Sequence, residues 1–342
     1  MKAVRFHRHG GPEVLQYEEA PDPKPNAEEA LVRVRACALN HLDLWARNGL
    51  PRVKIPLPHI SGSDISGVIE WVPKEETQFK KGDEVIINPG VGCGHCDRCL
   101  TGRDDQCKDY DIIGYGFDGG YAELVKVRRT HLIRKPEGMS FEEAASFPLV
   151  FETAYHMLVT KARAGPRDTV LVLAANSGVG FAAVQIAKLL GAEVIATAGD
   201  AEKMERARKL GADHAINHYK QDLLGEVKEL TGQQGVDVVI EHVGKATWES
   251  SLKALAKGGR LVTCGATTGA EVSTDLRYIY NRELTIYGSY MAGMGELLQV
   301  VELFSQGKLK TVVDSVYPLK KAAEAQTRME ASKHFGKIVL KV

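Results

Sequence analysis

The stretch TVLVLAANSGVGFAAVQIAKLLG, residues 169–191, sets the architecture of the region around it. Residues 169–175 are apolar and rich in β-branched side chains, which predicts a strand buried on both faces. The polar segment 176–178 interrupts this run, and apolar residues then recur at the spacing of an amphipathic helix that ends at Gly191. A strand, a tight turn and a helix in succession bring unpaired N–H groups and a positive helix end to one point, which suits a pyrophosphate.

The turn itself matches the dinucleotide-binding pattern G-x-G-x-x-G at one glycine position only, Gly180. Alone it is equally compatible with an ordinary strand-to-helix turn. Strands predicted at 193–198, 236–241, 260–264 and 284–288, with a helix at 202–210, favour a doubly wound parallel sheet that binds ligands at the carboxyl ends of its strands. We therefore expect a nucleotide at the turn residues Ser177, Gly178, Val179 and Gly180.

Length and charge limit the remaining possibilities. The chain has 342 residues, enough for two domains. Its 44 basic and 44 acidic residues balance, which favours neither nucleic acid nor an anionic membrane as a partner. No apolar run is long enough to span a bilayer, and the first residues lack the apolar core of a signal peptide. We expect a cytoplasmic protein with a small-molecule substrate.

Residues 1–130 differ from the centre, because short β-rich runs alternate there with proline, glycine and charged clusters. We expect an irregular β-rich domain formed by residues 1–150 and 288–342, and a Rossmann domain at residues 151–287. The predicted strands and helix of the β-rich domain are at 30–36, 67–72, 84–88, 121–127, 319–331 (the helix) and 337–342.

Four of the six cysteines fall in one polar loop with the spacing C-x2-C-x2-C-x7-C. Four thiolates this close can surround a tetrahedral Zn²⁺ and leave no open position for a substrate. Disulfides do not suit a cytosolic chain with two further cysteines, and an iron–sulfur cluster is the weaker alternative. We expect one structural zinc ion per chain, in a lobe at residues 90–110, bound by Cys93, Cys96, Cys99 and Cys107.

The order of these regions resembles the medium-chain dehydrogenase/reductase superfamily, which includes zinc alcohol dehydrogenases and quinone or enoyl reductases. The motifs that carry the resemblance are Gly82-Asp83-Glu84-Val85, Gly92-Cys93-Gly94-His95-Cys96 and Leu210-Gly211-Ala212-Asp213. The resemblance covers the whole chain. It implies a GroES-like catalytic domain beside the Rossmann domain, an active site in the cleft between them, and a homodimer or homotetramer.

The positions that bind catalytic zinc in alcohol dehydrogenases of this superfamily carry other residues here. By the spacing of matching residues they are Asn40, Ser63 followed by Asp64, and Leu149, and none is a thiolate or an imidazole. The segment Asn40-His41-Leu42-Asp43 resembles the zinc-free reductases instead. The resemblance therefore implies NAD(P)(H)-dependent hydride transfer without a catalytic zinc, to activated C=C bonds, quinones or enoyl substrates.

Two alternatives stay open. His41 and His59 lie near the lost positions, with Asp43 and Asp64 close to them, so that a rearranged zinc site would make the protein an alcohol dehydrogenase. The third possibility is a nucleotide-binding protein without catalytic activity.

Without a metal, the substrate must be placed and polarised by hydrogen bonds. Asn40 can hydrogen-bond a carbonyl or a ribose hydroxyl, and Trp45 can form an apolar wall. We expect Asp43 to orient its neighbours and to pair with Arg47, in catalysis or as a structural salt bridge. Tyr290 is a candidate proton donor, and it stands where carboxylating enoyl-CoA reductases carry a histidine, which favours a plain reductase.

The end of the second predicted strand bears on the choice of nucleotide. NAD enzymes place an acidic residue there, and this chain has Ala198. Lys203 lies where reductases of this type contact the 2′-phosphate, although Asp200 would repel that phosphate. We expect NADP(H) to be preferred over NAD(H). The remaining cofactor-binding residues that the resemblance implies are Thr153, His218, Tyr219, Gly265, Ala266, Gly288, Ser289 and Lys337, the last at a pyrophosphate-binding position.

Overall fold

A computed structural model describes residues 1–50 and 53–342. The chain divides into two compact units, one formed by Met1–Leu149 with Gly293–Val342 and the other by Val150–Ala292. The chain returns to the first unit at Gly293 and not at residue 288, and the Ser289 N–H still donates to the Thr263 carbonyl of the second unit, at 2.8 Å.

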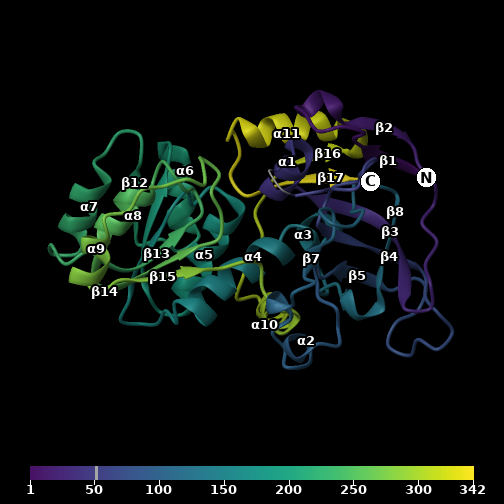
Figure 1. The fold of residues 1–342 in the computed structure, drawn as a ribbon, viewed down its shortest axis with the longest axis horizontal. Coiled ribbons are helices and arrows are strands. Elements are labelled where there is room, and N and C mark those ends of the chain that lie inside the picture. Colours follow the sequence, from purple (N-terminus) through teal and green to yellow (C-terminus); the bar gives the residue numbers. More distant parts are fainter. Residues whose placement is uncertain (51–52) are drawn as a thin grey trace. The chain divides into compact units, whose positions relative to one another are not determined.

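The second unit is built on a six-stranded parallel sheet in the order β12-β11-β10-β13-β14-β15, within residues 150–292, all of which are described (Figure 1). This order places the topological switch point between β10 and β13 and confirms the predicted doubly wound fold. The strands are β10 (Thr169–Val172), β11 (Glu193–Ala198), β12 (His214–Asn217), β13 (Val236–Glu241), β14 (Leu255–Thr263) and β15 (Thr285–Gly288).

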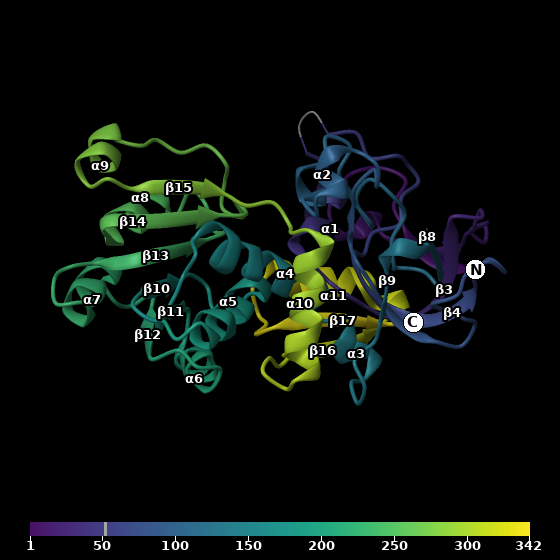
Figure 2. The same cartoon turned by 90° about the horizontal axis from the view of Figure 1, so that it is seen from below.

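Helices connect these strands and pack against the sheet, with α5 against β10 and β11, and α6 against β11 and β12 (Figure 2). The helices are α4 (Pro148–Tyr155, continued by a π-helical turn at His156–Lys161), α5 (Gly178–Leu189), α6 (Ala201–Lys209), α7 (Leu223–Leu230), α8 (Trp248–Ala254) and α9 (Leu276–Asn281). Strand β14 begins at Leu255 and not at residue 260. Leu255 pairs with Val236 and Arg260 with Val238, so the residues between them, which include Gly258 and Gly259, form a bulge within the strand.

The first unit contains a mostly antiparallel sheet of the β-rich type that the sequence predicts. Among its described residues, the sheet has the order β16-β17-β3-β4-β5-β9, and β8 pairs with β3 outside this path. Its strands are β3 (Glu29–Ala38), β4 (Asp64–Trp71), β5 (Glu84–Ile87), β8 (Leu124–Arg128), β9 (Leu132–Arg134), β16 (Val313–Pro318) and β17 (Lys337–Lys341).

Short elements surround this sheet. The helices are α1 (His41–Asn48), α2 (Asp97–Leu100), α3 (Phe141–Ala144), α10 (Met294–Ser305) and α11 (Ala322–Glu330), with 3-10 turns at Pro12–Val14, Asp104–Gln106, Arg129–His131 and Leu319–Lys321. Two small two-stranded sheets pair β1 (Lys2–Arg5) with β2 (Gln16–Glu19), and β6 (Gly90–Val91) with β7 (Asp111–Ile112). Among the described residues, no helix is both long and apolar enough to cross a bilayer.

The pairing of the last strand with β3 positions the candidate site. Strand β17 runs antiparallel to β3, with Val339 opposite Ala38. The Leu39 N–H donates to the Ile338 carbonyl at 2.9 Å. The start of β17 therefore lies beside the end of β3, where α1 begins.

Gly180 provides a test of the turn geometry. A Cβ at this position would lie 2.2 Å from the Ala174 carbonyl oxygen, so Gly180→Ala forces the helix away from the strand. We expect a loss of about 1–3 kcal/mol of stability and weaker nucleotide binding, measured by urea denaturation and nucleotide titration.

The control is Gly295→Ala in helix α10, where a Cβ meets no atom within 4 Å. This change should be neutral or slightly stabilising, by about 0.5–1 kcal/mol. Equal stability of both variants would contradict the close approach of helix and strand at Gly180.

Candidate functional site

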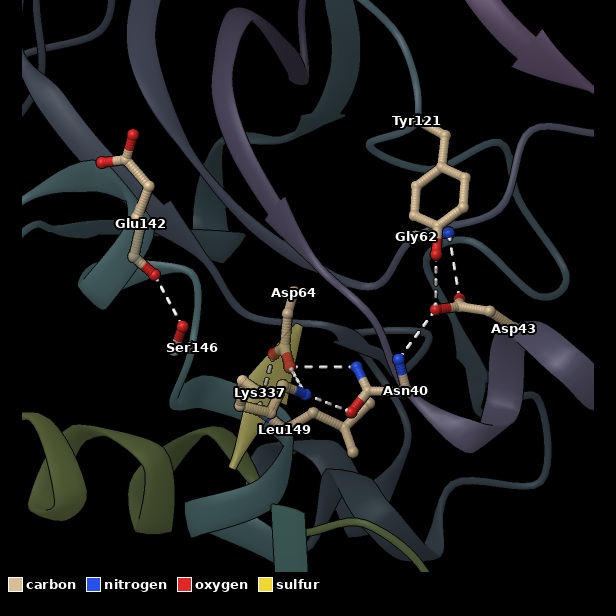
Figure 3. A network of polar contacts seen from close by, with 9 residues as sticks. All are labelled: Asn40, Asp43, Gly62, Asp64, Tyr121, Glu142, Ser146, Leu149 and Lys337. Atoms are coloured by element: carbon tan, nitrogen blue, oxygen red, sulfur yellow. Dashed lines mark hydrogen bonds and ion pairs between the residues drawn. The ribbon is translucent and has the colours of Figure 1, made fainter. Parts of the chain in front are cut away.

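Three of the residues expected at the positions of the catalytic-zinc ligands, Asn40, Asp64 and Leu149, lie in a buried hydrogen-bonded cluster in the first unit (Figure 3). Asn40 Nδ2 donates to Asp64 Oδ2 at 2.9 Å, and the Leu149 N–H donates to Asp64 Oδ1 at 2.8 Å. Lys337 Nζ donates to Asp64 Oδ2 at 2.9 Å and to Asn40 Oδ1 at 2.5 Å. The sequence placed three of these residues at one site, whereas the role of Lys337 in it was not predicted.

A second carboxylate, Asp43, lies directly beside this cluster (Figure 3). It accepts hydrogen bonds from the Asn40 N–H at 2.8 Å, the Gly62 N–H at 3.2 Å and the Tyr121 hydroxyl at 3.0 Å. Its complete burial raises its pKa to about 6, although these hydrogen bonds act in the opposite direction. Asp43 therefore connects helix α1 to the loop that leads into β4.

The predicted pairing of Asp43 with Arg47 is wrong. The fully buried Arg47 turns toward helix α11, where it contacts Gln326 at 2.5 Å and forms an ion pair with Glu330. Its Nε also donates to the Gly10 carbonyl at 3.1 Å. Two residues of one helix four positions apart can meet, but here each has better partners on other elements.

The donor atoms of the cluster do not fit a catalytic zinc ion. Such an ion takes three protein ligands, commonly imidazole, thiolate or carboxylate. Leu149 offers no ligand atom, Ser63 offers only a hydroxyl, and both oxygens of Asp64 already accept hydrogen bonds. The ammonium group of Lys337 adds a positive charge that would repel a divalent cation.

The two histidines of the alternative metal site have other contacts in the first unit. His59 Nε2 contacts the Gly114 carbonyl at 3.0 Å, and burial lowers its pKa, as expected for a neutral core histidine. The His41 ring lies 6.2 Å from the ring of Trp45 on helix α1. Among the described residues, only the four lobe cysteines form a group of three or more side chains able to hold one metal ion.

In the second unit, the carboxyl ends of the parallel strands carry the predicted nucleotide-binding residues. Ser177 caps helix α5 by accepting the Gly180 N–H at 3.0 Å. His242, which directly follows β13, lies across the switch point, and its Nε2 contacts the Leu173 carbonyl at 2.9 Å. The close fit at Gly180 and the helix N-terminus together form a cradle suited to a pyrophosphate.

The predicted 2′-phosphate residues gather at the end of β11. The Asp200 side chain caps helix α6 by accepting the Lys203 N–H at 2.8 Å, and its other oxygen lies 3.6 Å from Lys203 Nζ. The ring of Tyr219 lies against Gly199 and 4.4 Å from the ring of His218. Burial, with the charge of Lys203, lowers the pKa of His218, which keeps this ring neutral near pH 7.

The remaining predicted residues follow β14 and β15 or lie nearby. Ser289 is buried, and among the described residues its hydroxyl has no hydrogen-bond partner, which suits a group that meets a ligand. A Cβ at Gly288 would meet open space. Tyr290 is 55% exposed, and Thr153 is buried in α4. Gly265 and Ala266 lie in the loop after β14, beyond Cys264.

The four lobe cysteines have the geometry of a tetrahedral zinc site. Neighbouring sulfur atoms lie 3.6 Å (Cys96–Cys99), 3.8 Å (Cys96–Cys107) and 3.9 Å (Cys93–Cys99) apart. Four Zn–S bonds of about 2.3 Å in a tetrahedron place the sulfurs about 3.8 Å apart. These residues therefore fit a structural zinc ion, whose bonds would hold the lobe together.

The lobe is tied to the rest of the first unit. Both oxygens of Asp104, three residues before Cys107, lie 3.2 Å from the Met294 N–H at the start of α10. On the other side, Arg128 donates to the Gly92 carbonyl at 2.6 Å. Hydrogen bonds therefore connect the lobe to helix α10 and to strand β8.

Comparisons with known proteins agree with this architecture. Residues 26–137 match the family model of the alcohol dehydrogenase GroES-like domain, and residues 178–306 match that of the zinc-binding dehydrogenases. The chain is 36% identical to an alcohol dehydrogenase of Geobacillus stearothermophilus over 100% of both chains, and 31% identical to a quinone oxidoreductase of Pongo abelii over 99% of this chain and 97% of that protein. A crystal structure of an NAD-dependent alcohol dehydrogenase covers 100% of both chains with a TM-score of 0.97 and 47% identity.

The lobe cysteines allow a direct test of their role. Cys99→Ser should lower the zinc content and the thermal unfolding midpoint, since a structural zinc contributes about 10–16 kcal/mol to the folding of small zinc-binding peptides. Hydride transfer by the remaining folded enzyme should change little. Elemental mass spectrometry, thermal unfolding and kcat measure the three effects.

Cys264→Ser is the matched control for zinc content, because Cys264 lies outside the lobe and burial raises its pKa to about 12. This variant should keep the zinc of the wild type. If Cys99→Ser lost activity with fold and stability intact, the structural assignment would be wrong.

Proposed function

The chain belongs to the medium-chain dehydrogenase/reductase superfamily, and from that premise we propose that it transfers hydride without a catalytic zinc, reducing activated C=C bonds, quinones or enoyl substrates. It is an NAD(P)-dependent oxidoreductase, as its relatives are. The proposal goes further in two respects: the enzyme has no catalytic zinc ion, and its substrates are conjugated or quinone carbonyl compounds.

One observation carries this proposal: an amide and a carboxylate stand at positions where the resemblance places zinc ligands, and a lysine pairs with that carboxylate. Lys337 and Asp64 balance each other's charge, and Asn40 joins them through two hydrogen bonds. A leucine side chain at Leu149 and a serine at Ser63 complete the set and cannot replace a thiolate and an imidazole.

The cluster supports reduction of a conjugated carbonyl. A bound NAD(P)H supplies the hydride. Addition of hydride to the β-carbon moves the π electrons onto the carbonyl oxygen, and a proton added at the α-carbon completes the reaction. The Asn40 amide can donate an N–H to the developing negative charge on that oxygen, where a preorganised donor acts most strongly.

Oxidation of an alcohol requires a proton acceptor and not a hydrogen-bond donor, because the hydroxyl must lose its proton. Asp64 accepts three hydrogen bonds within the cluster, and Asp43 accepts three from its own neighbours. Both nearby carboxylates are therefore engaged, and the cluster is better equipped to donate than to remove a proton.

A second candidate function is the interconversion of alcohols with aldehydes or ketones. It is favoured by the names of the similar proteins, several of which are alcohol dehydrogenases. On this alternative, a metal site would have to form from residues such as His41 and His59, of which His59 contacts the Gly114 carbonyl at 3.0 Å and the His41 ring lies 6.2 Å from that of Trp45.

For the nucleotide, we propose a preference for NADP(H). Support comes from Lys203 in the first turn of α6, which follows β11, and from Ala198 in the place of the acidic residue that binds ribose hydroxyls. The ion pair with Asp200 partly offsets the charge of Lys203, and three similar proteins are described as NAD-dependent, so the preference should be modest.

The proposed reaction can be tested together with the metal content. Freshly purified protein should contain one zinc ion per chain by elemental mass spectrometry and should oxidise NADPH with quinones or enones. Primary and secondary alcohols should not be oxidised. Two zinc ions per chain together with alcohol oxidation would favour the second candidate function.

Lys203→Ala tests the preference for NADP(H). Loss of a partly balanced charge near the 2′-phosphate should raise the KM for NADPH about 10-fold, while the KM for NADH stays within twofold, in steady-state assays with one acceptor. Lys209→Ala, on the same helix and exposed, is the control and should change neither KM. Equal effects of Lys203→Ala on both nucleotides would contradict a role at the 2′-phosphate.

A further inference from the structure

Lys337 is a buried cation on the last strand of the chain. Its side chain is 3% exposed, and its ammonium group contacts Asn40 Oδ1 and Asp64 Oδ2 (Figure 3). Removing an ammonium group from water costs several kcal/mol unless close ionic and hydrogen-bonding partners offset that cost. The contacts with Asn40 and Asp64 are therefore the reason that this lysine can remain in the core.

The charge of the cluster is balanced without a metal. Asp64 is completely buried, and its Oδ2 accepts from both Asn40 and Lys337, while its Oδ1 accepts the Leu149 N–H. One ammonium group thus faces one carboxylate. A divalent cation between Asn40 and Asp64 would have to displace the ammonium group from the space it occupies.

The lysine also fixes the orientation of the Asn40 amide. An ammonium group can only donate, so the atom of Asn40 that faces Lys337 must be the oxygen. An ionised carboxylate can only accept, so the atom that faces Asp64 must be the nitrogen. Since each contact excludes the flipped amide, the two together hold one orientation.

In this orientation, the hydrogen-bonding groups of Asn40 and Lys337 that remain available are donors. One N–H of the Asn40 amide is used by Asp64, and two of the three N–H groups of Lys337 are used by Asn40 and Asp64. Among the described residues, the remaining N–H groups of these two side chains have no acceptor. An incoming carbonyl oxygen matches them, whereas the proton of an alcohol finds no base in the cluster.

We propose that Lys337 is a positioning residue that stands in place of a catalytic metal: its ammonium group balances Asp64 and orients the Asn40 amide to donate to a substrate carbonyl oxygen. This inference rests on the proposed function and gives its substrate class a physical basis. The acceptor is a carbonyl or quinone oxygen that gains negative charge during hydride transfer.

The first variant is Lys337→Met, in the full-length protein, assayed with NADPH and the enone or quinone that the wild type reduces. A small misplacement of a positioned group costs about 10²-fold in rate, so kcat should fall by about that factor. The KM for NADPH should stay within twofold. Lys341→Met, on the same strand with a side chain 68% exposed, is the matched control and should leave both constants unchanged.

Lys337→Met also leaves Asp64 as a buried unpaired charge, so a loss of stability accompanies it. The double variant Lys337→Met/Asp64→Asn removes both charges and should recover much of the thermal unfolding midpoint. It should not recover kcat, because an amide at position 64 can donate or accept and no longer enforces one orientation of Asn40.

Two results would overturn this inference alone, in an enzyme whose wild type is active. Recovery of kcat together with stability in the double variant would show that Lys337 serves only to balance a charge. A higher KM for NADPH in Lys337→Met, with kcat retained, would show that it contacts the nucleotide pyrophosphate. A wild type that reduces no conjugated carbonyl, or that carries two zinc ions per chain, would overturn the proposed function as well.

Discussion

The arrangement of the first unit depends on one buried carboxylate, Asp64, which must be paired and hydrogen-bonded to remain in the core. Its three donors come from distant parts of the chain: Asn40 at the end of β3, Leu149 in α4 and Lys337 at the start of β17. Because all three must converge on the same two oxygen atoms, the carboxylate joins the beginning, the middle and the end of the sequence. The polar site is a direct consequence of that requirement.

The cysteine lobe and the cluster around Asp64 differ in the kind of cation that they suit. The cysteine lobe presents four sulfurs at tetrahedral spacing and is connected to helix α10 through Asp104, so a zinc ion there would act on stability. The cluster around Asp64 balances its charge with a lysine instead. In the second unit, strand ends and a helix N-terminus supply the neutral donors that suit a nucleotide. The Asp64 cluster, the cysteine lobe and the strand ends of the second unit thus present three different kinds of interaction.

Comparison of the predicted with the observed elements shows which patterns are informative. Strands β11 and β13 have the predicted bounds, because both faces of an inner parallel strand are covered and most of its residues are apolar. Strand β12 was not predicted, since His214–Asn217 is short and partly polar at the sheet edge. The predicted Asp43–Arg47 pair is wrong for a related reason. Spacing along a helix shows which side chains can meet, but the partner that each one takes depends on residues from other elements. Here Arg47 contacts Gln326, and Asp43 accepts a hydrogen bond from Tyr121.

Local patterns were sufficient to predict the alternating strands and helices and the group of four cysteines, because each depends on residues close together in the chain or on side-chain chemistry alone. The contact of Lys337 with Asn40 and Asp64 joins residues almost three hundred positions apart, and it depends on the register of β17 against β3. That register follows from the packing of the entire sheet, since a shift by one residue would turn every side chain of β17 to the opposite face. Only the folded chain could therefore reveal that Lys337 contacts both Asn40 and Asp64.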